Sequence, residues 1–325
     1  MRSLTMSQAI NEALREEMRS QPTLILLGQD IGPYGGTFGV YRGLFEEFGE
    51  DRVRDGPLCE SATVGFAIGA AINGMRTVVE LEFMDFVTVA MDQIVNQAAK
   101  MHYFFGGQIN VPMVIRTPIV SRMGMGSQHS QSLEAWFMHV PGLKIAIPSN
   151  AYDAKGLLKT ALRDSNPVLF VENVRLYSTK SEVPETDYSI PFGQARVLRE
   201  GSDLTMVAIS GTVPVALAAA DQLAQKEVSV EVVDPRTLNP FDIETLAGSL
   251  RKTGKVLITH DGYRTAGVGA EIGQRLAEEA FNYLDAPILR VTGQDVPVTS
   301  GDLHLAMVPN CDTLVKASME LMGKG

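Results

Sequence analysis

Glu60 is the first residue whose type and position could carry chemistry. It stands directly before SATVGFAIGAAING, a run of small and apolar residues that is typical of a buried helix. A carboxylate is stabilised at a helix start by free N–H groups and by the helix dipole. At the edge of an apolar cavity, desolvation would instead favour the neutral carboxyl, which suits proton exchange with a ligand. The residues alone favour the first interpretation, a charge at a helix start.

Small residues recur along the helix that follows. Ser61, Gly65, Gly69 and Asn73 are spaced by four and therefore share one stripe of the helix surface. Each interior glycine costs a helix roughly 1 kcal/mol relative to alanine, so two on one stripe indicate that another backbone packs closely there. That backbone could belong to the same domain or to a second chain, and the spacing does not choose between them.

His129 is the second candidate. It lies in MGMGSQHSQS, a glycine- and serine-rich loop that follows an expected strand, Val111 to Pro118. Parallel strands bind ligands beyond their carboxyl ends, so this loop could deliver His129 to a site. A histidine that is merely solvated in a loop would look the same. His139 and His260 are expected to be structural.

The composition sets limits on function. The chain has 325 residues, of which 45% are hydrophobic, and its 28 basic and 38 acidic residues give a net charge of -10. The acidic residues are spread along the chain, which argues against a nucleic-acid surface. No apolar run approaches membrane length, and the N-terminus reads as an amphipathic helix rather than a signal peptide. We expect a cytoplasmic protein, or a mitochondrial-matrix protein if a transit peptide has been removed.

Short apolar segments alternate with helical patterns, which predicts an α/β fold with mainly parallel sheets. The first domain is expected at residues 1–175, a polar linker at 176–200 and a second, smaller α/β domain at 201–325. Helices are expected at 85–105 and 151–163. The expected strands are 23–28, 77–83, 111–118, 143–149 and 167–173 in the first domain, and 204–210, 228–234, 255–261 and 287–293 in the second.

Several motifs carry a resemblance to a known family. ESATVGFAIGA has the form Glu, four residues, Gly-Phe-x-x-Gly-Ala, and resembles the pyrimidine-side motif of thiamine-diphosphate enzymes. DGPLCES, QHSQS, PGLKIAIPSNAYDAKGLL, NPVLFVEN and DPRTLNP follow in the order of one family. That family is the beta subunit of the thiamine-diphosphate-dependent decarboxylating component of 2-oxo acid dehydrogenase complexes, acting on pyruvate, branched-chain 2-oxo acids or acetoin. The resemblance implies a pyrimidine-binding domain followed by a transketolase-type C-terminal domain.

The resemblance also implies roles for individual residues. Glu60 would hydrogen-bond a ring nitrogen of the cofactor's aminopyrimidine, and His129 would assist proton and acyl transfer to lipoyl. Leu58, Glu82 and Phe86 would contact the cofactor, with the Phe86 ring packed on the pyrimidine. Glu82 departs from the family, which usually carries methionine or glutamine at this position.

Further implications concern metals and partners. The chain lacks the Gly-Asp-Gly motif that binds magnesium and diphosphate, so an alpha subunit should supply it in a heterotetramer of two alpha and two beta chains. The lipoyl acyltransferase core would be a second partner. LRDSNP resembles a structural potassium site, with Asp164 and Asn166 as ligands, although a helix end followed by a turn explains it equally well. The alternatives are an acetoin dehydrogenase beta subunit, a transketolase-like carbohydrate transferase and a non-catalytic assembly subunit.

Overall fold

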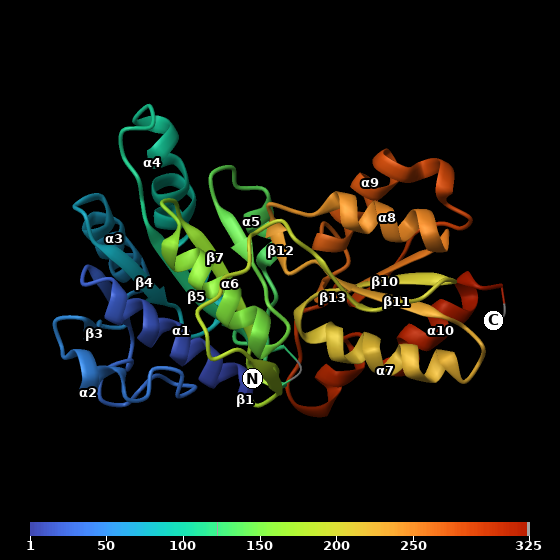
Figure 1. Ribbon diagram of the computed structural model, residues 1–325, viewed down its shortest axis with the longest axis horizontal. Helices are drawn as coiled ribbons and strands as arrows, with labels where there is room; N and C mark the ends of the chain where they lie inside the picture. The colour runs from blue at the N-terminus through green and yellow to red at the C-terminus, as the bar shows by residue number, and fades with distance from the viewer. Residues whose placement is uncertain (122, 324–325) are drawn as a thin grey trace. The chain divides into compact units, whose positions relative to one another are not determined.

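The chain forms two compact units. The computed structural model describes residues 1–121 and 123–323 (Figure 1). Unit 1 comprises Met1–Val120 and Trp136–Phe192, and unit 2 comprises Ser121–Ala135 and Gly193–Gly325. The sequence suggests contiguous domains, yet the segment from Ser121 to Ala135 groups with unit 2. Its contacts explain this, because Met125 pairs with Ser300 and a Cβ on Gly124 would lie 2.7 Å from the backbone nitrogen of Gly301.

The central sheet of unit 1 is parallel, as the apolar segments predict. Its strands follow the order β6-β7-β5-β4-β2-β3. A separate antiparallel pair joins β1 to β8. The strands are β1 (Arg2–Thr5), β2 (Leu24–Gly28), β3 (Val53–Asp55), β4 (Arg76–Glu80), β5 (Met113–Ile119), β6 (Lys144–Ala146), β7 (Val168–Asn173) and β8 (Lys180–Val183).

Helices cover this sheet on both faces. The helices α1 and α6 pack on one face over alternate strand residues such as Leu24, Leu26 and Val168, while α3 packs on the other face against β2, β4 and β5. Alternate side chains of a strand point to opposite faces, so strands covered on both sides need continuous apolar runs. The helices are α1 (Met6–Ser20), α2 (Leu44–Phe48), α3 (Glu60–Ile72), α4 (Ala99–Phe104), α5 (Glu134–Met138) and α6 (Ala151–Arg163).

Two local features of unit 1 differ from the predicted elements. The N-terminal helix begins only at Met6, because Thr5 and Gln8 form a reciprocal capping box and the four residues before Met6 form β1. The helix expected at 85–105 is interrupted: a 3₁₀ turn spans Met84–Thr88 and a π-helical segment spans Gln93–Ala98 before α4. The pattern of apolar residues does not reveal such changes of helical pitch.

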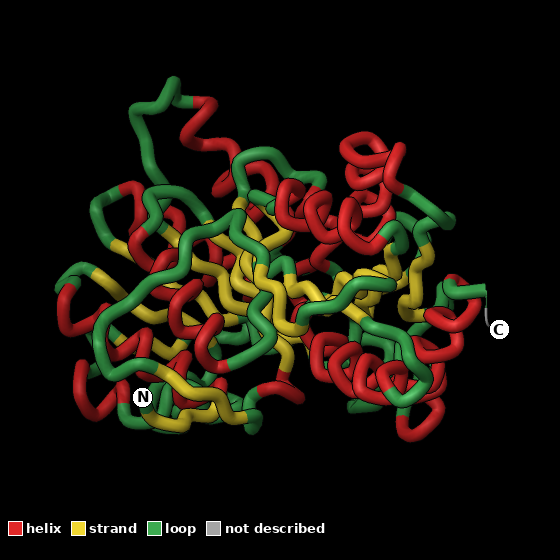
Figure 2. Tube along the Cα trace, turned by 45° about the vertical axis from the view of Figure 1, so that its right-hand side comes forward, coloured by secondary structure: helices red, strands yellow, loops and turns green. Residues whose placement is uncertain are grey.

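Unit 2 is a smaller α/β sandwich. Its sheet has the order β14-β13-β10-β11-β9, parallel except for the edge strand β9. Helices α7 and α10 pack on one face and α8 and α9 on the other (Figure 1), and Figure 2 shows helices, in red, on both sides of the yellow strands. The elements are β9 (Arg196–Arg199), β10 (Leu204–Ala208), α7 (Val213–Ala224), β11 (Val230–Asp234), β12 (Thr237–Asn239), α8 (Ile243–Thr253), β13 (Val256–Tyr263), α9 (Val268–Ala280), β14 (Leu289–Gly293) and α10 (Cys311–Leu321).

None of the helices within residues 1–121 and 123–323 combines the length and the apolar character needed to cross a lipid bilayer.

Candidate functional site

Glu60 is the first residue of α3 and lies at the carboxyl edge of the unit 1 sheet. The strands β2 and β4 are parallel neighbours, so their ends at Gly28 and Glu80 meet at the same edge. Between these ends and the start of α3 lies a small pocket, and the half-buried Glu60 forms part of its wall. The pocket is lined by Gly28, Gln29, Pro57, Cys59, Glu60, Thr63, Glu80, Leu81 and Glu82.

The pocket brings two of the predicted cofactor residues together. Glu82 shares its wall with Glu60 and accepts a hydrogen bond from the Thr37 hydroxyl. Phe86 is half-buried in the following 3₁₀ turn and contacts Phe83 edge-on, with ring centroids 5.4 Å apart. Leu58 lies on the loop before α3 with 71% of its surface exposed, and it does not line the pocket.

A third carboxyl group, Glu80, reaches the same pocket from a buried charge cluster that the sequence analysis missed. Arg116 on β5 lies opposite Glu80 in the sheet register. The guanidinium donates from Nε and Nη2 to the Glu172 carboxylate on β7, at 2.7 Å each, and from Nη1 to the Tyr41 hydroxyl at 2.5 Å. The Tyr177 hydroxyl donates to Glu172 Oε2 at 2.5 Å.

Burial and the charges of this cluster shift the pKa of Glu80. Burial raises the pKa of the Glu80 carboxyl to about 7; Arg116 opposes this shift, while Glu172 and Glu82 add to it. Burial also raises the pKa of Tyr41 and Tyr177 well above the usual value, so both phenols stay neutral. The cluster therefore contains one guanidinium cation and two carboxyl groups, of which Glu80 lines the pocket.

A signal for this cluster exists in the sequence. Three expected strands each carry a charged residue within a mainly apolar run, namely Glu80 in TVVELEF, Arg116 in VPMVIRTP and Glu172 in PVLFVEN. Charged residues are rarely fully buried unless they are paired. Charges of opposite sign in several apolar strands therefore indicate a buried ion pair, although the partners are known only once the strand order is known.

The residues proposed for potassium lie after α6, elsewhere in unit 1. The Asp164 carboxylate accepts from Lys144 Nζ at 2.5 Å and from the Asn166 backbone N–H at 2.9 Å. The backbone carbonyls of Leu162 and Asp164 accept from Arg76 Nη1. Asn166 Oδ1 is buried and has no hydrogen-bond partner within the described structure. One oxygen of the Asp164 carboxylate and two carbonyl oxygens near this turn are thus engaged by cationic side chains.

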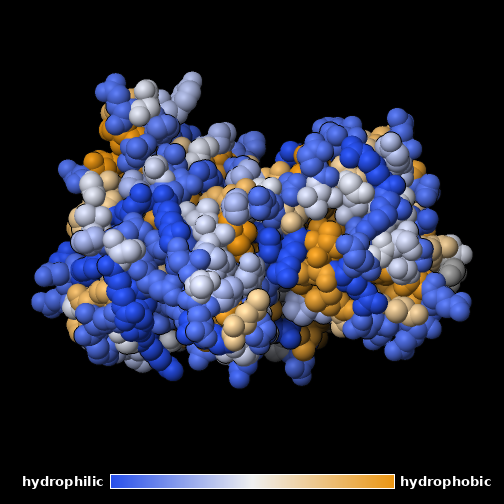
Figure 3. Space-filling model, viewed as in Figure 1, coloured by the Kyte–Doolittle hydropathy of each residue, from blue (hydrophilic) through white to orange (hydrophobic). Residues whose placement is uncertain are grey.

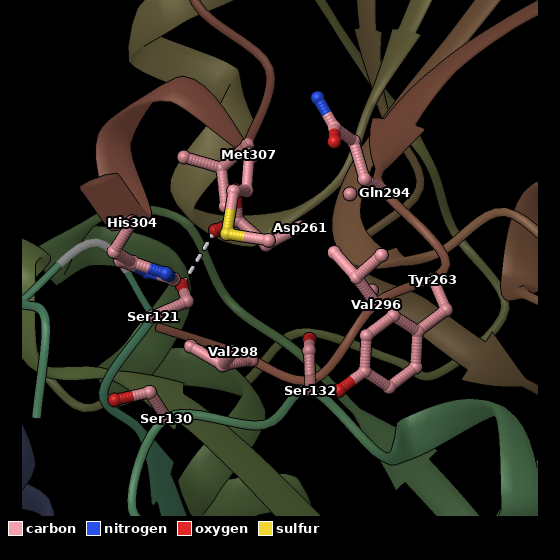
Figure 4. Close-up of a pocket in the computed structure, with 13 residues that line it drawn as sticks. Ser121, Ser130, Ser132, Asp261, Tyr263, Gln294, Val296, Val298, His304 and Met307 are labelled. Atoms are coloured by element: carbon pink, nitrogen blue, oxygen red, sulfur yellow. Dashed lines mark hydrogen bonds between the residues drawn. The ribbon is translucent and has the colours of Figure 1, made fainter. Parts of the chain in front are cut away.

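His129 belongs to unit 2, in the loop from Ser121 to Ala135. The residue is half-buried, and its backbone N–H donates to the Gly126 carbonyl at 3.3 Å. Its neighbours Ser130 and Ser132 line a small pocket of unit 2 together with Asp261 and His304 (Figure 4). Ser130 Oγ is buried there without a hydrogen-bond partner among the described residues. The loop thus places the hydroxyl-bearing residues Ser130 and Ser132 in the lining of this pocket.

Two buried groups of unit 2 have shifted pKa values. Burial lowers the pKa of His260 to about 4, and its Nε2 accepts from the Gly269 N–H at 3.2 Å, so the ring is a neutral structural acceptor as predicted. Burial raises the pKa of Glu134 to about 6, although the Ser132 hydroxyl donates to its carboxylate. No group of three or more His, Cys, Asp or Glu side chains in residues 1–121 and 123–323 is arranged to hold a metal ion.

Comparison with known proteins defines the class first. Residues 2–180 match the family model described as transketolase, pyrimidine binding domain, and residues 193–313 match that of the transketolase C-terminal domain. A solved structure, a split gene transketolase described as an inactive beta4 tetramer, superposes with a TM-score of 0.81 at 23% identity over 98% of each chain. These matches confirm the predicted two-domain, transketolase-type α/β fold.

Sequence relatives then identify the family within this class. The pyruvate dehydrogenase E1 component subunit beta-2 of Oryza sativa subsp. japonica is 42% identical over 98% of this chain and 86% of its own. The corresponding subunit beta of Rhizobium meliloti is 41% identical over 98% and 69%. The acetoin:2,6-dichlorophenolindophenol oxidoreductase subunit beta of Bacillus subtilis is 40% identical over 99% and 98%. The chain belongs to this family of 2-oxo acid dehydrogenase beta subunits, as the motifs predict.

Proposed function

We propose that this chain is the beta subunit of a pyruvate dehydrogenase-type enzyme. It would contribute the pyrimidine side of a thiamine-diphosphate site and act in oxidative decarboxylation of a 2-oxo acid, with acyl transfer to the lipoyl group of an acyltransferase core. The observation that carries the proposal is the position of Glu60, the first residue of α3, in the wall of a pocket at the carboxyl edge of a parallel sheet. Relatives at 41–42% identity that are named as pyruvate dehydrogenase subunits support it.

The donor set of the pocket suits an aminopyrimidine ring. Such a ring presents both nitrogen acceptors and an amino donor, and carboxyl groups can accept or donate according to their protonation. Glu60 and Glu82 line the pocket. Phe86 follows Glu82 by four residues, in the 3₁₀ turn Met84–Thr88. When bound, thiamine diphosphate supplies the electron sink on which a 2-oxo acid loses carbon dioxide.

Within this site, Glu60 is the proton-holding group. Its carboxyl would hydrogen-bond a ring nitrogen and share a proton with it, a role that needs a carboxyl only partly exposed to water. Glu82, held by Thr37, would add a second carboxylate to the wall and orient the ring's amino group. His129 would exchange protons with the substrate during acyl transfer. Leu58 would reach the cofactor from the loop before α3.

The open face of α3 supports the need for a partner chain. A Cβ on Gly69 would meet nothing within 4 Å, and one on Gly65 would meet only Gln93, so the small-residue stripe is not filled by its own chain. Phe66 on the same helix is 54% exposed. A helix of such apolar composition is normally covered on all sides. We therefore assign this face to contact with another subunit.

Aromatic residues at the end of α4 extend this argument. Tyr103 and Phe104 are 91% and 80% exposed, and apolar atoms show at the surface over this helix (Figure 3). Exposed aromatic clusters of this kind mark subunit contacts. We propose an alpha subunit that also supplies the magnesium and diphosphate ligands, in an assembly of two alpha and two beta chains working in the cytoplasm.

A potassium ion near Asp164 has weaker support. Asn166 Oδ1 is a buried oxygen available to a cation, but the Asp164 carboxylate and the neighbouring carbonyls are engaged by Lys144 and Arg76. Of the two candidate side chains, Asn166 would therefore offer a cation an unengaged oxygen, whereas Asp164 would first have to release Lys144. The site would stabilise the turn after α6 and take no part in catalysis.

Reconstitution tests the proposed function. The chain should be expressed with the product of the adjacent gene and assayed with pyruvate, branched-chain 2-oxo acids and acetoin, using an artificial electron acceptor. We expect thiamine-diphosphate-dependent turnover of pyruvate by the assembled complex and none by the chain alone. Turnover of acetoin alone would favour the second candidate, which the Bacillus subtilis relative supports. An assembled complex that turns over none of these substrates would leave a non-catalytic assembly role.

A further inference from the structure

Glu80 is a carboxyl group of the pocket to which the proposed function gives no role. Glu80 and Glu82 are two residues apart at the end of β4, and both line the pocket that contains Glu60. Only 5% of the Glu80 surface is exposed. A buried carboxylate without a counter-charge is unfavourable, so the chemical state of Glu80 depends on what surrounds it.

The cation nearest to Glu80, Arg116, binds mainly to Glu172. Arg116 makes a two-pronged contact with Glu172 at 2.7 Å for each oxygen, whereas its Nη1 lies 3.5 Å from Glu80 Oε1. Fork-to-fork pairing of a guanidinium with one carboxylate is the strong arrangement, and a contact of 3.5 Å contributes little. Arg116 therefore neutralises Glu172 first and Glu80 only in part.

The second oxygen of Glu80 has no partner within the described chain. Glu80 Oε2 is buried and makes no hydrogen bond. The loop that carries Gly36 and Tyr41 closes over it: a Cβ on Gly36, which has φ of +84°, would lie 2.9 Å from the Tyr41 ring and 3.6 Å from Glu80 Oε2. The side chain is thus enclosed by protein but forms part of the pocket lining.

We propose that Glu80 is a neutral carboxylic acid that donates a hydrogen bond into the pocket, to an acceptor atom of the nitrogen heterocycle bound there, and that the neighbouring Glu82 favours this neutral form. The identity of the heterocycle rests on the proposed function, whereas the protonation of Glu80 does not. The charge count supports the neutral form, because one guanidinium faces two buried carboxyl groups. The pKa of about 7, raised first by burial, agrees with it.

Several titratable groups around Glu80 enter this balance, and Cys59 also lines the pocket. Arg116 from β5 favours ionisation, while Glu172 from β7 and Glu82 from the end of β4 oppose it. Tyr41 and Tyr177 are neutral members of the cluster. Glu60 faces the same pocket from α3. Glu82 can be altered without breaking the bidentate pair of Arg116 with Glu172.

Infrared spectroscopy of the full chain tests the protonation directly. The carbonyl band of protonated carboxylic acids should contain a component that disappears with a midpoint near pH 7. Glu80→Gln should remove that component, Glu82→Gln should move its midpoint to lower pH, and the exposed Glu182→Gln should leave it unchanged. Glu134, whose pKa is about 6, contributes a separate component that Glu134→Gln identifies. Persistence of the pH 7 component in Glu80→Gln would overturn the assignment.

Calorimetry of the assembled complex tests the hydrogen bond. When the pH rises from 6 to 8, Glu80 loses its proton and can no longer donate. Thiamine diphosphate should therefore bind about five- to tenfold more weakly at pH 8 than at pH 6 in the natural protein. Glu80→Gln should bind equally at both pH values, because its amide donates at any pH. The donor role would be overturned if the natural protein bound thiamine diphosphate equally at both pH values while the infrared component of protonated Glu80 was present. Failure to bind the cofactor at any pH would refute the proposed function and leave the infrared result to decide the state of Glu80.

Discussion

Glu60→Gln should lower thiamine-diphosphate-dependent decarboxylation by roughly 10²- to 10⁴-fold, the usual contribution of a positioned acid or base. The amide keeps the size and the hydrogen-bonding edge of the side chain but cannot share a proton with a ring nitrogen. Because Glu60 is half-buried in the pocket wall and makes no ion pair that the structure records, assembly should be intact. Initial rates and gel-filtration profiles of the co-expressed complex measure both quantities.

A second helix provides a matched control. Glu244 lies in the first turn of α8, is exposed, and is not among the residues that line the Glu60 pocket. If Glu60 only stabilised the start of its helix, Glu60→Gln and Glu244→Gln would each cost about 0.3–1 kcal/mol of stability. The two variants would then have equal enzymatic rates. We expect Glu244→Gln to retain near-normal rates. Equal rates in the two variants would show that Glu60 has no catalytic role.

Arg116→Ala should destabilise unit 1 by about 3–5 kcal/mol, because it leaves buried carboxyl groups without their cation. The Arg116 side chain is fully buried, and its partner Glu172 is equally inaccessible. In Arg116→Ala, the carboxyl groups of Glu80 and Glu172 must share the interior as two like charges or take up protons. Urea denaturation followed by circular dichroism measures the loss.

The control for this variant is an exposed ion pair. Arg199 contacts Asp221, which is 72% exposed, so Arg199→Ala should cost less than about 1 kcal/mol. The double variant Arg116→Met with Glu172→Gln should recover part of the loss, because it removes both charges of the pair. A loss below 1 kcal/mol for Arg116→Ala would mean that the cluster is not the source of stability inferred here.

Regular elements of the fold were predictable where local patterns were strong. The helix at Ala151–Arg163 has the predicted bounds, since Asn150 caps it and the apolar spacing is regular. The strand β4 ends at Glu80 rather than at Phe83. The apolar pattern continues beyond Glu80 because the next residues are buried in a turn, so composition alone could not place the strand end.

Site residues were predictable only as far as a motif reached. Glu60 and Glu82 line one pocket and Leu58 is exposed outside its lining, while their contacts with a cofactor stay a prediction of the resemblance. The role of Glu80 depends on Arg116 and Glu172, which lie 36 and 92 residues further along the chain and meet it only in the folded sheet. Nonlocal pairing of this kind is set by strand order, which short-range patterns do not encode. The grouping of the His129 loop with unit 2 is nonlocal for the same reason.

The most direct test of the shared site is a calorimetric titration of thiamine diphosphate with magnesium. The titration is made into the full chain alone, into its alpha partner alone and into the assembled complex. Our account predicts tight binding only to the complex, with Glu60→Gln weakening it there, because this chain supplies the pyrimidine side and lacks the Gly-Asp-Gly motif for the diphosphate. Tight, magnesium-dependent binding to this chain alone would contradict it.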